Sequence, residues 1–417
     1  MPIGNRKSSS ENWAVALLTG GGDRPYVIGL GTALASKGIT FDLIGSDELD
    51  SPDLRSKPGV NFLNLRGDQR PEASVVTKIL RVSLYYARLI RYAATAKPEI
   101  FHILWNNKFE TFDRTLLMLY YKALGKKIVL TAHNVNARKR DSNDSRLNRL
   151  TLRIQYRLAD HVFVHTESMK RELIDDFGVE VSRVTVIPFG INNAVPITSL
   201  TPAEARQRLG IRDRDRAILF FGRITLRKGL DFLIAAFHKI LVGRDGYHLT
   251  IAGRPERCET YWTAIQETIR EDVQGGRVLL RADFIPDEET ELYFKAADVL
   301  VLPYRQIYQS GVMFLGYSFG LPVLAADVGS MKDDIVDGKT GFVFRPEDPD
   351  HLAKVIEQYF ASDLYADLSN RRKEIREHAI QRYSWDVVSQ MTMSVYAGLL
   401  QIPNATESLR GDVSSVS

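Results

Sequence analysis

Short apolar runs alternate with longer helical segments along most of the chain, and this alternation constrains the fold more than any other feature. The first run, Trp13 to Leu18, ends in three glycines, and a helical pattern to Lys37 separates it from a second run, Phe41 to Ile44. This order predicts a parallel β-α-β opening. In the same half we expect further strands at 100–104, 128–131, 161–165 and 184–187, and helices around 75–96, 111–124, 145–158 and 167–177.

The same alternation restarts after a loop at 192–200. Strands are expected at 217–221, 248–252, 278–280, 299–302, 323–325 and 341–344. A length of 417 residues also favours two domains over one. We therefore predict an α/β fold of two Rossmann-like, doubly wound parallel-sheet domains, 1–195 and 196–383, that face a central cleft. The polar segment 402–417 is expected to be a disordered tail.

Composition adds a few limits. The formal net charge of +4 suits an anionic substrate or an anionic membrane surface without choosing between them, and it does not imply nucleic acid. Cys258 is the only cysteine, so the chain has no internal disulfide, and its first residues lack the apolar core of a signal peptide. We expect a cytoplasmic protein. The uncharged run 306–326 is interrupted by polar and turn residues, so it predicts a loop, a buried helix and a strand rather than a membrane span.

The stretch Phe220 to Gly229, FFGRITLRKG, has the composition of an anion site. An apolar strand ends at Gly222, which permits a tight turn, and Arg223 and Lys228 follow before the next helix. A guanidinium can bind two phosphate oxygens at once, and an ammonium adds a point charge. We predict that these residues hold a diphosphate leaving group without a metal or a cofactor.

The glycine run Gly20, Gly21 and Gly22 lies where the first strand turns toward a helix. A loop of this kind lets backbone amides approach a ligand, and Gly21, Gly22 and Asp23 are candidate substrate contacts. The run lacks the GxGxxG spacing, which disfavours a dinucleotide site. A turn that only permits tight packing is the other interpretation, and both remain open.

His133 follows the strand IVLTA and precedes a loop, so we expect it to project from a sheet edge toward a ligand. A loop histidine bonded to its own backbone is the alternative. His102 and His165 fall inside predicted strands, and a structural role is expected for both.

Two further segments of the second half are candidate ligand contacts. The loop with Phe284 and Ile285 could stack and read a nucleobase, although an ordinary connection would look the same. Ser310 and Gly311 open an apolar helix whose first amides would favour phosphate, whereas Ser310 could equally be a helix cap alone. The expected contacts in this segment are Gln309, Ser310, Gly311 and Val312.

Taken together, these residues resemble glycosyltransferase family 4 and similar retaining GT-B enzymes that use nucleotide sugars. The specific part of the resemblance is the succession FFGRITLRKGLDFLIAAF, LTIAGRPE, FIPDEETELYFKAADVLVLPY, SFGLPVLAADVGS and DGKTGFVFRPEDPDHLAKVI. The first half matches more loosely through the glycine loop, TAHNV, VHTESMKREL and VTVIPFGIN.

The resemblance implies roles for individual residues. Arg223 and Lys228 match the diphosphate-binding cations of the family, and His133 matches the histidine that meets the donor sugar, so these three are the predicted catalytic residues. The segment from Tyr383 to Trp385 looks like the start of a closing helix, 384–401, that returns to the first domain. One departure is clear: the pair of glutamates usual in the family is missing, because no acidic residue lies between Tyr304 and Gly320.

The implied reaction moves a sugar from a UDP- or GDP-linked donor to a carbohydrate or lipid-linked acceptor hydroxyl, with retention, in exopolysaccharide, glycolipid or lipid-linked oligosaccharide synthesis. An inverting enzyme would need a carboxylate base, for which Asp23 or Asp113 are candidates. Arginines 81, 88 and 91 lie among leucines and tyrosines at helical spacing, which predicts either a helix at the inner face of a membrane or an ordinary solvated face. The alternatives are a sugar-nucleotide epimerase or phosphorylase of similar build and a non-catalytic sugar-nucleotide or carbohydrate-binding protein.

Overall fold

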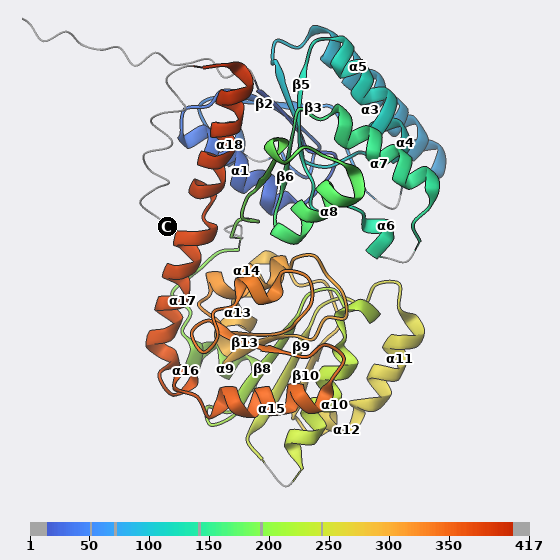
Figure 1. The fold of residues 1–417 in the computed structure, drawn as a ribbon. Helices are drawn as coiled ribbons and strands as arrows, with labels where there is room; N and C mark the ends of the chain where they lie inside the picture. The colour runs from blue at the N-terminus through green and yellow to red at the C-terminus, as the bar shows by residue number, and fades with distance from the viewer. Residues whose placement is uncertain are drawn as a thin grey trace, which may run out of the picture. The chain divides into compact units, whose positions relative to one another are not determined.

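The computed structural model describes residues 15–402 apart from 51, 71–72, 141–142, 192–194 and 243–244. The chain divides into two compact units: the first runs to Pro188 and resumes at Trp385, and the second runs from Phe189 to Ser384. Each unit is a β-sheet covered by helices (Figure 1). The tail expected at 402–417 lies, except for its first residue, outside the described residues.

The sheet of the first unit has seven strands in the order β3-β2-β1-β4-β5-β6-β7, and every neighbouring pair is parallel. The strands are β1 (Val15–Leu18), β2 (Phe41–Gly45), β3 (Val60–Asn64), β4 (Ile100–Ile103), β5 (Lys127–Thr131), β6 (His161–Val164) and β7 (Val184–Val186). Parallel strands buried on both faces have nearly continuous apolar runs, as β1 and β4 do. This sheet confirms the predicted fold class for the first unit.

Helices pack on both faces of this sheet (Figure 1). They are α1 (Arg24–Ser36), α2 (Pro52–Arg55), α3 (Val75–Thr95), α4 (Glu110–Phe112), the π-helical turn η1 (Asp113–Leu117), α5 (Met118–Ala123), α6 (Ala137–Arg140), α7 (Arg146–Leu158), α8 (Glu167–Phe177), the 3₁₀ turn η2 (Val181–Arg183) and, from the end of the chain, α18 (Trp385–Leu400).

Helix α18 belongs to the first unit although the whole second unit, Phe189 to Ser384, separates it from β7 in the chain. It packs on α1, where a Cβ on Gly29 would stand only 2.0 Å from the Trp385 indole. Inside the unit, the hydroxyl of Tyr396 shares a 2.6 Å hydrogen bond with Nδ1 of His102 on β4. His102 also bonds to Thr131 on β5 at 2.8 Å, so this buried imidazole links the last helix to two central strands.

The second unit repeats the architecture with six parallel strands in the order β10-β9-β8-β11-β12-β13. The strands are β8 (Arg216–Phe221), β9 (Tyr247–Ala252), β10 (Val278–Arg281), β11 (Val299–Leu302), β12 (Val323–Ala326) and β13 (Gly341–Phe344). The helices are α9 (Pro202–Leu209), η3 (Leu226–Lys228), α10 (Leu230–Leu241), α11 (Glu259–Thr268), α12 (Arg270–Gln274), α13 (Asp287–Ala296), α14 (Gly311–Ser318), η4 (Met331–Asp334), α15 (Pro349–Phe360), α16 (Asp363–Ala366) and α17 (Leu368–Tyr383). The two-sheet prediction is therefore confirmed.

Both sheets have a point where the strand order reverses, and ligands of open parallel sheets bind outside the carboxyl ends of the strands at such points. In the first unit this point lies between β1 and β4, and in the second between β8 and β11. The glycine run follows β1, and Gly222 follows β8. The candidate residues of each unit therefore lie where its topology places a ligand.

The run 306–326 forms a loop, α14 and β12, as expected. Across the described parts of the chain, no helix combines the length and apolarity needed to cross a bilayer.

Candidate functional site

Two predicted residues of the second unit, Lys228 and Ser310, meet at one residue that was not predicted, Tyr304. The Lys228 ammonium lies 3.6 Å from the centre of the Tyr304 ring, and the Ser310 hydroxyl is 3.3 Å from the Tyr304 hydroxyl. Gly222 adopts a φ of +106° that other residues rarely reach, and a Cβ there would be 3.3 Å from Val312. The turn after β8 and the first turn of α14 therefore enclose one small region.

The positive charge of Lys228 is not balanced by a neighbouring carboxylate. Within the described part of the chain its ammonium forms no ion pair, and its face-on contact with Tyr304 is a cation–π interaction. Burial, together with the charges of Arg227 and Arg223, holds the pKa of Lys228 well below its usual range. A bound anion would offset both the burial and the repulsion from the two arginines, so the charges at this site favour anion binding.

Arg223 lies at the outer side of this region. Its side chain is 75% exposed and forms an ion pair with Glu256 at 3.1 Å. An exposed pair of this kind contributes little to stability and can be exchanged for a phosphate. The guanidinium is therefore available to a ligand in a way that a buried, paired arginine would not be.

The N-terminus of α14 also lacks an internal cap. Ser310 has the extended backbone of a capping residue, but its side chain accepts no amide from the first turn and instead contacts Tyr304. The cap-only interpretation of Ser310 is thus not what the structure shows. Next to it, the Oε1 atom of Gln309 is buried and has no donor among the described residues. Free first-turn amides and the helix dipole favour an anion here.

The loop after β10 exposes one aromatic side chain and buries its neighbour. Phe284 is 69% exposed, whereas Ile285 is 8% exposed and belongs to the apolar core of the second unit. An exposed phenylalanine offers a flat face for stacking, while Ile285 holds the loop against the sheet.

In the first unit, the glycine run packs against side chains from two other segments. A Cβ on Gly22 would fall 1.9 Å from the Trp105 indole, and a Cβ on Gly21 would fall 2.6 Å from the Arg66 guanidinium. Asp23 accepts a hydrogen bond from the amide of Tyr26 and so caps α1. Close packing therefore accounts for the absence of side chains at Gly21 and Gly22, and the turn also brings Trp105 and Arg66 to this edge of the sheet.

His133 lies in an aromatic cluster just beyond β5. Its ring stacks on Trp105 with centroids 3.9 Å apart and planes 10° apart, and Tyr26 meets it edge-on at 4.8 Å. Its Nδ1 shares a 3.0 Å hydrogen bond with Nε2 of His165. Burial and the neighbouring histidines hold the pKa of His133 well below its ordinary value, so it is neutral at pH 7.

The two other histidines differ from one another. His102 is buried and structural, as its bonds to Tyr396 and Thr131 show. His165 lies just past the end of β6 and orients His133, a relationship that its position in the predicted strand did not reveal.

Across the described residues there is no group of three or more histidine, cysteine or carboxylate side chains that could hold a metal ion.

Comparison with known proteins agrees with this architecture. Residues 20–195 match the model of "Glycosyltransferase Family 4", and residues 215–362 match that of "Glycosyl transferases group 1". A D-inositol 3-phosphate glycosyltransferase of Acidothermus cellulolyticus is 24% identical over 91% of this chain and 86% of its own length.

Two solved structures have the same fold. Sucrose-phosphate synthase of Thermosynechococcus elongatus gives a TM-score of 0.73 at 20% identity, covering 93% of this chain and 99% of that one. The Anabaena protein HepE, solved in complex with UDP, gives 0.71 at 16% identity, covering 92% and 99%. The two Rossmann-like units therefore have the GT-B fold. With both halves matched by the family models, the chain belongs to glycosyltransferase family 4.

Sequence reasoning missed three residues that shape these sites: Tyr304, Trp105 and Arg66. Each lies just beyond a strand of one of the two sheets, β11, β4 and β3 respectively. The signal that could have identified Tyr304 and Trp105 as site residues was their position just after a predicted strand. Arg66 lacked even this signal, because β3 was not predicted.

Proposed function

We propose that this enzyme transfers a sugar from a UDP- or GDP-linked donor to an acceptor hydroxyl, and that the second unit holds the donor. The observation that carries the proposal is the Lys228 ammonium on Tyr304, a half-buried cation without a carboxylate partner in the described chain. Arg223, Gly222 and the Ser310, Gly311 and Val312 amides would bind the remaining diphosphate oxygens. Phe284 would stack on the base, with Ile285 behind it, and Gln309 would face the donor from the same loop.

The reaction follows from where charge develops. The bond between the anomeric carbon and the diphosphate oxygen breaks, and its electron pair stays on the leaving diphosphate. The acceptor oxygen forms the new bond to the anomeric carbon, and its proton passes to a phosphate oxygen of the donor. Fixed cations and amides around the diphosphate stabilise the transition state more than the bound substrate. Because no protein base is required on this route, we propose retention of the anomeric configuration.

For the first unit we propose contacts with the sugar and the acceptor. His133 is neutral and held by Trp105 and His165, so it can donate or accept a hydrogen bond without a charge change at pH 7. Gly21, Gly22 and Asp23 would approach the donor from the neighbouring loop. HepE, which shares the fold, has been solved with UDP-glucose as well as UDP, which makes UDP-sugars the first donors to test.

The proposed activity is tested by incubating the protein with a panel of UDP-, GDP- and ADP-sugars, with and without acceptor extracts, and measuring released nucleoside diphosphate. Acceptor-dependent release from one donor supports the transferase. Conversion of the donor sugar without release would indicate an epimerase. Thermal stabilisation by a nucleotide without any turnover would indicate a binding protein.

Helix α3 supports a second proposal, peripheral contact with an anionic membrane in glycolipid, exopolysaccharide or lipid-linked oligosaccharide synthesis. Its first turns expose Val75, Val76, Ile79 and Leu80 beside Lys78 and Arg81, which suits an interfacial helix. Sedimentation with vesicles of phosphatidylcholine and phosphatidylglycerol, compared with phosphatidylcholine alone, tests the proposal. The Ile79→Ser, Leu80→Ser variant should lose this binding, and unchanged binding would contradict it.

A further inference from the structure

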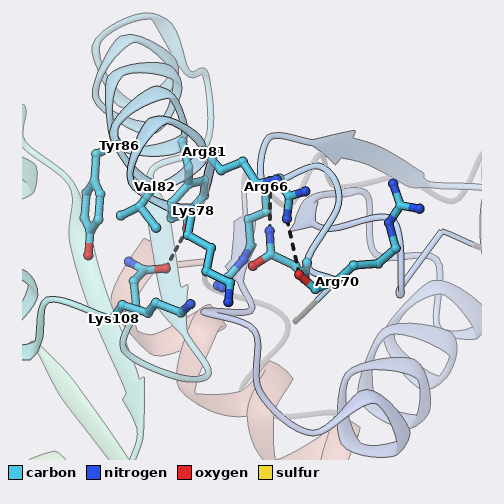
Figure 2. Close-up of a pocket in the computed structure, with 10 residues that line it drawn as sticks. Arg66, Arg70, Lys78, Arg81, Val82, Tyr86 and Lys108 are labelled. Carbon is cyan, nitrogen blue, oxygen red and sulfur yellow. Dashed lines mark hydrogen bonds between the residues drawn. The ribbon is translucent and has the colours of Figure 1, made fainter. Parts of the chain in front are cut away.

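The first unit contains a basic pocket that the donor site does not use. It has a volume of about 260 Å³ and lies under α3. Its lining includes five cations, which are Arg66, Arg70, Lys78, Arg81 and Lys108. The polar and aromatic part of the lining is Gln69, Tyr85, Tyr86 and Asn107. Figure 2 shows Lys78, from α3, and Lys108, from the loop after β4, extending into the same space.

The place of the pocket in the fold is that of a substrate site. Arg66 follows β3, and Asn107 and Lys108 follow β4, so the pocket lies at the carboxyl edge of the parallel sheet. Gly21 rests against the guanidinium of Arg66, which places the glycine loop beside the pocket. The segment that carries Asn107 begins with Trp105, the residue on which His133 stacks.

Arg66 is the strongest sign that the pocket takes an anion. The residue is only 9% exposed, and its Nε and Nη1 atoms have no hydrogen-bond acceptor among the described residues. The guanidinium lies over the Tyr85 ring, 5.1 Å from its centre. Buried donors left without acceptors destabilise a folded protein, and a bound anion would remove that cost.

The charge of the pocket is only partly balanced. Asp68 forms ion pairs with Arg81 at 3.0 Å and with Arg70 at 2.9 Å. Arg66, Lys78 and Lys108 have no carboxylate partner in the described part of the chain, and none of the pocket-lining residues is acidic. Three unbalanced cations exceed what one carboxylate ligand requires, whereas a phosphate ester carries up to two charges and three terminal oxygens.

The neutral lining suits the rest of such a ligand. The Tyr85 hydroxyl donates to the Asn107 carbonyl oxygen at 2.6 Å, and the Asn107 amide donates to Asp113 at 3.3 Å. These bonds fix the Asn107 side chain in place. Fixed polar groups beside an aromatic ring are the usual means of orienting sugar hydroxyls.

We propose that this pocket binds a phosphate ester on the acceptor, so that the acceptor of this enzyme is an anionic, phosphorylated molecule. The inference rests on the proposed transferase function and names its acceptor class. The phosphate can belong to a soluble sugar phosphate or to a lipid headgroup, and the chemistry at Arg66, Lys78 and Lys108 is the same in both cases.

The test is a calorimetric titration of the full-length protein saturated with UDP, so that the proposed donor site is filled, with glucose 6-phosphate as the probe. The pocket variant Lys78→Gln, Lys108→Gln should weaken binding by about tenfold or more, since each lost charged contact is worth over 1 kcal/mol. The matched control Lys57→Gln, Lys97→Gln removes the same charge from exposed lysines outside the pocket, and its affinity should stay within about twofold of wild type.

A second arm repeats the comparison with phosphatidylcholine vesicles that contain phosphatidic acid. The site is assigned to a lipid headgroup if two results are found together. The wild-type protein binds the vesicles but not glucose 6-phosphate, and the pocket variant, unlike the control variant, no longer binds the vesicles. The proposal would be overturned if the pocket variant bound both probes as tightly as the wild type. It would also be overturned if the pocket variant and the control variant lost the same affinity. The affinity for UDP is measured separately: its absence would refute the donor site and leave the pocket result standing.

Discussion

The ammonium nitrogen of Lys228 lies 3.6 Å from the centre of the Tyr304 ring, and the hydroxyl of the same tyrosine meets Ser310. One aromatic side chain thus positions both the cation of one loop and the start of a helix from another. The contact fixes the position of the Lys228 ammonium but does not neutralise its charge. The first predictions about the proposed donor site rest on this unbalanced charge.

The affinity for UDP should fall as pH rises, beginning well below the usual lysine value of 10.5. Burial lowers the pKa of Lys228, so its proton is lost early in an alkaline titration, and the neutral amine attracts a diphosphate less. Lys228→Arg keeps its charge throughout and should flatten the pH dependence, whatever its absolute affinity. Calorimetry between neutral pH and the alkaline limit of stability measures both slopes, and parallel slopes would contradict this role.

Replacement of Arg223 with alanine should lower turnover by about 100-fold while leaving the folded protein intact. The side chain is exposed, and among the described residues its one ion pair is with Glu256 at the surface, so its loss removes little stability. Arg208→Ala, on the exposed side of α9, is the matched control and should retain full activity. Nucleoside diphosphate release and thermal unfolding are measured for both proteins. Equal activity in the two variants would remove Arg223 from the site.

Gly22→Ala should destabilise the protein by about 1–3 kcal/mol, because the new methyl group would fall 1.9 Å from the Trp105 indole. Displacement of Trp105 should also disturb the stacked His133 and change the tryptophan fluorescence. Gly398→Ala in α18 is the control: no atom of the described residues lies within 4 Å of its Cβ, and alanine should stabilise the helix by roughly 0.5–1 kcal/mol. In thermal unfolding, the melting temperature of Gly22→Ala should fall below that of the wild type, and the melting temperature of Gly398→Ala should rise above it.

Asp113 should make stability depend on pH in a definite direction. Burial raises the pKa of its carboxyl from 3.8 to about 6, against hydrogen bonds from Tyr86 and Asn107 and the charge of Arg114. Between these two values the folded state binds more protons than the unfolded state, so the unfolding free energy falls as pH rises. The loss approaches roughly 3 kcal/mol above pH 6.

Asp113→Asn should remove that part of the pH dependence. Chemical unfolding at pH 4.5 and pH 7.5 gives a difference for each protein, and the variant should show the smaller one. Asp334 of the second unit has a similarly raised pKa, about 6, and contributes to both proteins alike. If the unfolding free energy changed equally between pH 4.5 and pH 7.5 in both proteins, ionisation of Asp113 would not destabilise the folded state.

Much of the fold was predictable because its strands are apolar on both faces. β9, YHLTIA, is buried at every residue, and runs of this kind are visible in the sequence. β3 was missed because it lies at the sheet edge: Asn61 is exposed, and none of its residues is fully buried. Similarly, the helix expected at 111–124 contains a π-helical turn from Asp113 to Leu117, which periodicity alone does not reveal.

Site residues were predictable from the sequence only where the residues that act together lie in the same short motif. Gly222 and Lys228 lie in one short segment between β8 and α10, so their assignment to one site could be made from spacing. The pairing of Lys228 with Tyr304, or of Gly21 with Arg66, joins segments that are dozens of residues apart and depends on strand order. The glutamates that the family resemblance led us to seek are absent, and the sequence alone did not point to the basic pocket beside Gly21.

The return of α18 to the first unit also bears on how the protein is made. His102 and Gly29 emerge from the ribosome long before Tyr396 and Trp385, their partners, have been synthesised. The second unit, by contrast, is one uninterrupted segment and can complete its core while the first still has an open face along α1. In a nascent chain the domain begun first is therefore finished last, and in the interval its uncovered apolar surface is the part that a chaperone would bind.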